Sequence, residues 1–170
     1  MARDQRFQLN PAQQKGFTRP ELLGALLLTA LLASIAIALM QTLAIREQVQ
    51  QALDDSLPIQ HAVARHILEL GDVPEDEADA GLDPRTGETV SKFLQGARVS
   101  RGRIVLVFGK QAHQRIAMSQ LALTPYLDEE GRLGWRCGNG AEPGGKPVVA
   151  EADSPDSGIP LYYLPAKCRP

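Results

Sequence analysis

The chain has 170 residues and a net charge of −2, and 44% of its residues are hydrophobic. Its first sixteen residues carry three cations and one acid, so the remaining chain has a net charge of −4. This acidic balance argues against a broad nucleic-acid-binding surface, although a small local patch stays compatible with it. The length indicates one domain with appendages.

The amino-terminal segment, residues 1–16, is polar and rich in glutamine. It lacks the apolar centre of an ordinary secretory signal, because the apolar stretch comes later, from Leu22 to Met40. As a helix this uncharged stretch spans roughly 28 Å, close to the hydrocarbon thickness of a bilayer. Positive charge before it predicts a cytoplasmic amino end. One interpretation is a single-span membrane anchor with a short cytoplasmic tail.

A carboxylate, Glu21, lies at the edge of this apolar stretch, where an acid is costly and indicates function. It ends the sequence Lys-Gly-Phe-Thr-Arg-Pro-Glu, residues 15–21. This sequence, followed by an apolar helix, resembles the processing site of type IV prepilins. The resemblance implies that a prepilin peptidase cuts between Gly16 and Phe17 and that Phe17 becomes N-methylated. It also implies that Glu21 guides assembly by pairing with the terminal amine of a neighbouring subunit.

The chain also departs from the family pattern. Many members have two apolar residues where this chain has Arg19 and Pro20. Many also have a glycine in place of Ala30 and a proline in place of Ala38. These helix-breaking residues help the family's helix to unfold locally in a filament. Their absence leaves two alternatives open, a main filament subunit and a minor one.

The helical pattern continues after Met40. One stripe follows a three-or-four spacing and contains a single polar residue: Val49, Leu53, Leu57, Gln60, Val63, Ile67 and Leu70. Pro58 predicts a bend and Gly71 predicts the end of the helix. We therefore expect one long helix, with residues 17–45 in the membrane or fibre core and residues 46–70 packed on a head.

Residues 72–87 are rich in acid, proline and glycine, which predicts a surface loop. Four of its acids suggest a calcium site: Glu75, Asp76, Glu77 and Asp79. Their spacing does not match an EF-hand loop, and runs of acids are usually solvated. We therefore expect no metal and no cofactor.

Strand character begins at Thr89. The pattern predicts a hairpin of strands 97–100 and 103–109, a third strand over 116–127 and a fourth over 133–138. The expected fold class is α+β. A long amino-terminal helix packs on a small four-stranded antiparallel sheet, within a globular head of residues 71–170.

Two cysteines, Cys137 and Cys168, lie near the end of the chain. In an exported chain they are expected to form one disulfide, which would pin a tail rich in Gly and Pro to the fourth strand. The tryptophan strand before Cys137 and the Tyr-Leu-Pro-Ala sequence before Cys168 resemble the disulfide-bounded loop of type IVa pilins. Pseudopilins of type II secretion generally lack that bridge, so the resemblance favours a pilin.

No motif points to an enzyme. The three histidines have no metal-binding spacing, and no phosphate loop or nucleophile elbow is present. Basic residues around the predicted hairpin suggest solvent cover, a complement to acidic neighbours in a filament, or a weak DNA contact: Arg98, Arg101, Arg103, Lys110 and Arg115.

The expected function is therefore a structural subunit of a type IV pilus, serving adhesion or motility. The resemblance implies four partners: other pilin subunits, prepilin peptidase, the assembly machinery and the inner membrane. The precursor would span the inner membrane once, and the assembled subunit would be extracellular. The alternatives are a minor pilin or a tip module that binds DNA, a type II secretion pseudopilin, and a membrane-tethered enzyme.

Overall fold

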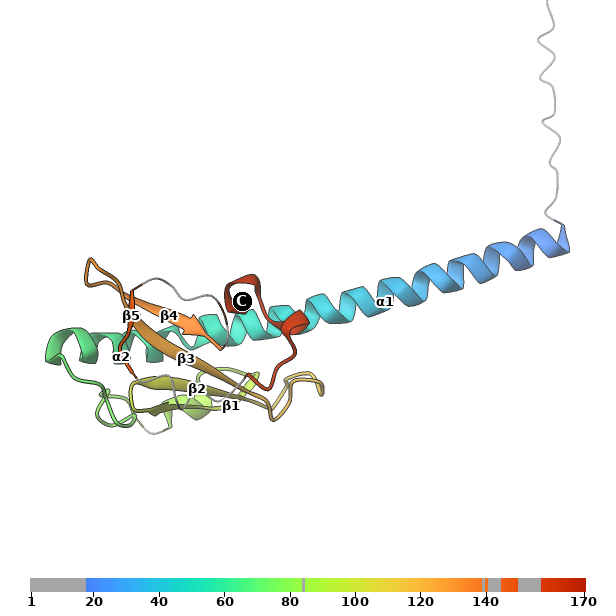
Figure 1. The fold of residues 1–170 in the computed structure, drawn as a ribbon. Helices are drawn as coiled ribbons and strands as arrows, with labels where there is room; N and C mark the ends of the chain where they lie inside the picture. The colour runs from blue at the N-terminus through green and yellow to red at the C-terminus, as the bar shows by residue number, and fades with distance from the viewer. Residues whose placement is uncertain (1–17, 84, 139, 141–144, 150–156) are drawn as a thin grey trace, which may run out of the picture. The chain divides into compact units, whose positions relative to one another are not determined.

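The computed structural model describes residues 18–83, 85–138, 140, 145–149 and 157–170. The chain forms two compact units, Met1–Ala38 and Leu39–Pro170. Helix α1, Arg19–Asp55, begins in the first unit and ends in the second (Figure 1).

In the first unit, the described residues form the apolar part of α1. Its most apolar window has a mean hydropathy of 2.6 and none of it is buried, so by length and composition the helix can cross a membrane. The hydroxyl of Thr29 donates to the carbonyl of Leu26 at 2.9 Å, and Ser34 donates to Leu31 at 2.7 Å. Both polar side chains are therefore satisfied within the helix, which an apolar environment requires.

In the second unit, α1 buries Ile45, Val49, Ala52 and Leu53, one stripe at helical spacing. Helix α2, Leu57–Leu70, follows it. It ends as predicted at Gly71, which has a φ of 72° and donates its N–H to the carbonyl of Ile67 at 3.1 Å.

The predicted bend at Pro58 is a break between α1 and α2. Proline has no N–H for the carbonyl four residues earlier, so the helical ladder is interrupted there. Ser56 lies in the gap with its side chain fully buried. Its hydroxyl donates to the carbonyl of Leu53 at 2.7 Å and accepts from the Gln60 amide at 2.8 Å.

The buried stripe continues across this break at three-or-four spacing, because Ser56 and not Leu57 follows Leu53 on the buried face. In α2 the buried residues are Ile59, Ala62, Val63 and Ile67. The expectation that Leu57 and Leu70 belong to the buried stripe is therefore wrong, since their side chains are 46% and 68% exposed.

We expect Ser56→Ala to lower the free energy of unfolding by about 1–3 kcal/mol, because it removes two buried hydrogen bonds and leaves the Gln60 amide with a 3.3 Å contact to Leu53. The measurement is thermal unfolding of the full chain in mild detergent, followed by the fluorescence of its one tryptophan. Ser100→Ala, at an exposed strand position, is the matched control. Equal unfolding of the two variants would contradict this role of Ser56.

Among the described residues, five strands form one antiparallel sheet, and the predicted α+β class is confirmed. The spatial order is β1-β2-β3-β4, and β5 pairs with β3. Figure 1 shows the sheet beside α2 and the end of α1. The strand bounds are β1 Leu94–Ser100, β2 Arg103–Phe108, β3 Gln120–Leu127, β4 Leu133–Cys137 and β5 Lys146–Pro147.

Several predicted strand bounds need correction. Strand character does not begin at Thr89, because this residue ends the short helix α3, Thr86–Thr89, and the first strand begins at Leu94. The third strand begins at Gln120 and not at Ile116. Residues before it form a turn, in which the amides of Ile116 and Ala117 donate to the carbonyl of His113 at 2.9 and 3.0 Å.

The core lies between the helices and one face of the sheet. It contains side chains from both helices, from β1 to β3 and from the carboxyl-terminal tail. Fully buried members include Val49, Val63, Leu94, Ile104, Leu106, Phe108, Leu121 and Tyr163. In the described part of the tail, the chain forms two short 3-10 helices, η2 Leu161–Tyr163 and η3 Ala166–Cys168.

Candidate functional site

The predicted processing site, Gly16 and Phe17, lies outside the described residues. The predicted assembly residue, Glu21, lies in the first turn of α1. Its Oε2 atom accepts from both the amide and the hydroxyl of Thr18, each at 3.4 Å. Thr18 precedes the helix, and its carbonyl accepts the amide of Leu22 at 3.0 Å.

This arrangement resembles a capping box, in which the acid three residues into a helix accepts the N-cap amide. The signal in the sequence is Thr18-x-x-Glu21, which sequence reasoning missed because it treated the acid only as an assembly residue. Glu21 therefore has a local structural role at the start of α1. Both bonds are long, so they hold this carboxylate only weakly.

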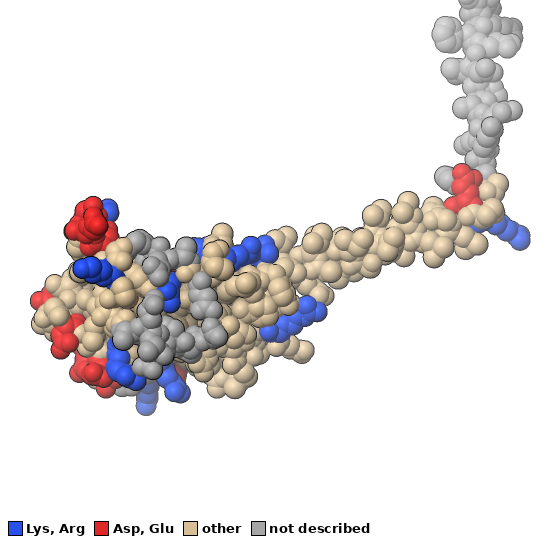
Figure 2. All heavy atoms as spheres, in the orientation of Figure 1, with Lys and Arg blue, Asp and Glu red and all other residues tan. Residues whose placement is uncertain are grey.

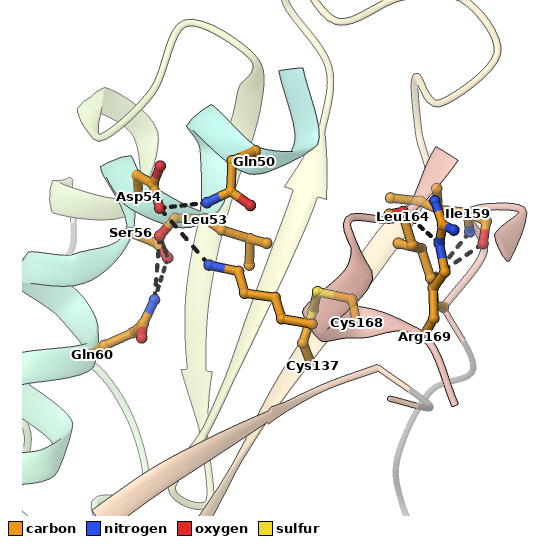
Figure 3. The surroundings of a disulfide bond; sticks show 12 residues. Gln50, Leu53, Asp54, Ser56, Gln60, Cys137, Ile159, Leu164, Cys168 and Arg169 are labelled. Carbon is orange, nitrogen blue, oxygen red and sulfur yellow. Dashed lines mark hydrogen bonds and ion pairs between the residues drawn. A yellow bond between two sulfur atoms is a disulfide. The ribbon is translucent and has the colours of Figure 1, made fainter. Parts of the chain in front are cut away.

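The disulfide that closes the carboxyl-terminal tail is present, as predicted. Cys137 at the end of β4 is bonded to Cys168 in η3, with 4.8 Å between their Cα atoms (Figure 3). Both residues are buried, at 5% and 0% exposure. The bridge joins the last residue of the edge strand to a segment 31 positions further along the chain.

Non-covalent contacts also hold the tail against α1. The Nε atom of Arg46 donates to the carbonyl of Tyr162 at 2.6 Å. Near the end of α1, the ammonium of Lys167 lies 3.8 Å from the carboxylate of Asp54, which also accepts from Gln50 at 2.8 Å (Figure 3). The tail therefore contacts α1 at two positions, Arg46 and Asp54, and the disulfide fixes the tail to the sheet. Sequence reasoning missed these contacts, because they join residues more than 100 positions apart.

Two tyrosines organise the turn at η2. The Tyr163 hydroxyl accepts from the guanidinium of Arg115 at 2.7 Å, and this bond raises the pKa of Arg115 above its usual range. The Tyr162 ring meets that of Tyr163 edge-on at 4.2 Å between centroids. A hydrogen bond with Tyr163 also raises the pKa of Tyr162. Arg115 therefore stays charged, and Tyr162 stays neutral, at physiological pH.

The basic cluster suggested by the sequence is not a single patch. Arg103 is buried, at 6% exposure. Arg101 lies in the turn before β2, whereas Lys110 and Arg115 follow the other end of that strand, roughly 20 Å away. Lys110 also donates to the carbonyls of residues 88 and 91. The strand therefore separates these cations, because they belong to its opposite ends.

The acids of the 72–87 loop bond to backbone amides. Glu77 accepts the amide of Val99 at 3.0 Å, Asp76 accepts that of Asp79 at 3.0 Å, and Asp79 accepts that of Glu75 at 3.2 Å. Within the described ranges, no group of three or more His, Cys, Asp or Glu side chains is placed to hold a metal ion.

These features define a class of protein: an α+β chain with a long apolar amino-terminal helix and a globular unit closed by a carboxyl-terminal disulfide. A family model described as pilin, of bacterial filaments, matches residues 46–169. The type IV major pilin protein PilE of Neisseria gonorrhoeae is 27% identical over 159 residues, which cover 92% of this chain and 94% of that protein.

Two further relatives also match this chain over nearly its whole length. A fimbrial protein of Neisseria meningitidis serogroup A is 26% identical over 162 residues, covering 92% of this chain and 94% of the relative. The fimbrial protein EcpC of Eikenella corrodens is 24% identical over 157 residues, covering 92% and 91%. The chain belongs to the pilin family, a structural family and not an enzyme family, and its resemblance to type IV pilins is confirmed.

Proposed function

We propose that the chain is a structural subunit of a type IV pilus, which serves adhesion or motility. The observation that carries this proposal is the apolar part of α1, of which none is buried in the isolated chain. Such a surface is not stable in water and must be covered by lipid or by other apolar helices. In a pilus subunit, lipid covers this surface while the chain is in the membrane, and the helices of neighbouring subunits cover it in the fibre.

The four segments then have distinct roles. Residues 1–16 are a leader, which prepilin peptidase removes before Phe17 is N-methylated. Residues 17–45 span the inner membrane, with the amino end in the cytoplasm, and later form the fibre core. Residues 46–70 pack on the globular head of residues 71–170. The assembly machinery extracts the mature subunit from the membrane and adds it to the other subunits.

In this scheme Glu21 pairs with the terminal amine of a neighbouring subunit. A lone carboxylate at the membrane edge is unfavourable by up to roughly 2.5–3.5 kcal/mol, and an amine brought by a neighbour offsets that cost only on assembly. The weak contacts to Thr18 support this role, because they leave the carboxylate able to exchange its partner.

We expect Gly16→Val to block removal of the leader, because a peptidase that works at a membrane surface needs a small residue beside the bond it cuts. Immunoblots of membrane fractions should show the full-length precursor and little mature protein. Gly24→Val is the matched control, since it makes the same substitution eight residues downstream, where an added Cβ atom meets no other atom within 4 Å. Mature protein that begins at Phe17 in the Gly16→Val strain would refute the proposed cut.

A further inference from the structure

We propose that the second unit binds anionic phospholipid headgroups at the end where α1 enters it, while the mature subunit waits in the membrane. This surface, the collar, consists of Arg46, Arg115, Leu161 and Tyr162. The inference rests on the membrane stage of the proposed function and adds a partner to it.

The position of Arg46 along α1 places it at headgroup depth. Arg19 and Arg46 are 27 positions apart in one continuous helix, which corresponds to about 40 Å. This length matches a bilayer with its polar headgroup regions, about 40–45 Å. Two cations at this separation therefore lie at the two surfaces of the membrane. The helix just before Arg46 is still apolar and exposed, at 72% for Met40 and 60% for Leu43.

The turn at η2 lies at the same depth, because Arg46 donates to the carbonyl of Tyr162 at 2.6 Å. Leu161 and Tyr162 both point away from the core, with 52% and 54% of their side chains exposed. Tyrosine is enriched at membrane interfaces, since its ring is apolar and its hydroxyl is polar. An exposed Leu-Tyr pair beside the end of an apolar helix is well suited to the boundary between headgroups and acyl chains.

Arg115 supplies a second cation to the collar. Its Nη1 atom donates to the hydroxyl of Tyr163, next to Tyr162, at 2.7 Å. The nearest acid on α1 is Glu47, which is exposed and adjacent to Arg46. The collar therefore has a net charge of +1 with Glu47 included. In the view of Figure 2, the charged side chains where α1 enters this unit are Lys or Arg.

This chemistry fits a phosphodiester surface. Guanidinium groups bind phosphate oxygens in a bidentate manner, and anionic lipids attract cations near the surface by about 1 kcal/mol each, or about fivefold in a binding constant. A second copy of the chain is the other class of partner that could cover this surface, and it is an outcome of the test.

The test uses the mature full-length chain in lipid nanodiscs that hold one copy each. Hydrogen exchange is measured by mass spectrometry on the peptide around Leu161 and Tyr162. Nanodiscs of phosphatidylcholine alone are compared with nanodiscs that contain phosphatidylglycerol. For a net charge of +1 we expect exchange to be about fivefold slower in the anionic discs. We also expect 1 M salt, with a Debye length of about 3 Å, to remove this difference.

Two variants of opposite sign test the role of charge. Arg115→Gln brings the collar to zero net charge and should abolish the difference between the two lipids. Glu47→Gln brings it to +2 and should increase the difference to about twenty-five-fold. Arg98→Gln, which removes an exposed cation from β1, is the matched control and should behave like the wild type.

Two results would overturn headgroup binding by the collar, provided that the apolar part of α1 is protected from hydrogen exchange in the discs. The first is an equal exchange rate of the peptide in the two lipids, and the second is an unchanged difference between the lipids in Glu47→Gln. Protection of the peptide only in discs that hold several copies would also overturn it and would assign the surface to a second copy. Rapid hydrogen exchange along the apolar part of α1 would instead contradict the membrane stage of the proposed function, on which the collar depends.

Discussion

Replacing Glu21 by glutamine should leave the membrane pool of mature protein unchanged and lower the yield of sheared fibres by about tenfold or more. The reason is that a charge-assisted contact is worth about 1.5–3 kcal/mol, and the substitution removes the charge that would meet a neighbour's amine. Glutamine can still accept the amide of Thr18 in a capping box, so the start of α1 is preserved.

Glu21→Ala separates the two roles of this side chain. Because it removes both the cap and the charge, fibre yield should fall at least as far as with glutamine. Membrane insertion and cleavage at Gly16 should remain normal. The measurement is fibre yield after shearing, compared with mature protein in the membrane. If Glu21→Gln made fibres normally and only Glu21→Ala failed, the residue would act as a helix cap, and the pairing with a neighbouring amine would be excluded.

Removing the disulfide should destabilise the second unit by about 3.5–4 kcal/mol, because the bridge closes a loop of about thirty residues in the unfolded chain. The double variant Cys137→Ser, Cys168→Ser avoids leaving a reactive thiol. For a unit of this size the loss should lower the unfolding temperature by about 10 °C, measured by tryptophan fluorescence of the full chain in detergent. We expect the variant to be inserted in the membrane but depleted from fibres.

Lys167→Gln is the matched control for this experiment. It removes the exposed ion pair with Asp54 in the same tail, whose partners are 54% and 56% exposed, and should cost at most about 1 kcal/mol. If the double serine variant were no less stable than Lys167→Gln, the contact of Arg46 and the burial of Tyr163 would hold the tail without the bridge. Free thiols in wild-type protein, found by peptide mapping under non-reducing conditions, would also contradict the account.

The fold class could be predicted from the sequence because it depends on local patterns. The uncharged stretch Leu22–Met40, the stop at Gly71 and the short run of apolar residues in β2 each indicate their element without knowledge of the rest of the chain. The bridge between Cys137 and Cys168 could be predicted as well, because an exported chain with two cysteines has only one internal pairing.

The errors arose where long-range contacts decide the structure. Ile116 has the character of a strand residue, yet it is fully buried in a turn because the chain must reverse between β2 and β3. Helical spacing after Leu53 allows either Ser56 or Leu57 on the buried stripe, and packing against the core buries Ser56 and leaves Leu57 46% exposed. The contact from Arg46 to Tyr162 joins residues 116 positions apart, and no local pattern indicates it.

Mass spectrometry of sheared, purified fibres tests the central claim most directly, because it reports abundance, the cut site and methylation together. We expect this chain to be the most abundant protein of the fibre and to begin at Phe17 with one added methyl group. Trace abundance would instead identify a minor pilin. Fibres that lack the chain, while the cell membrane retains it with residues 1–16 still attached, would contradict the account and indicate a simple membrane-anchored domain.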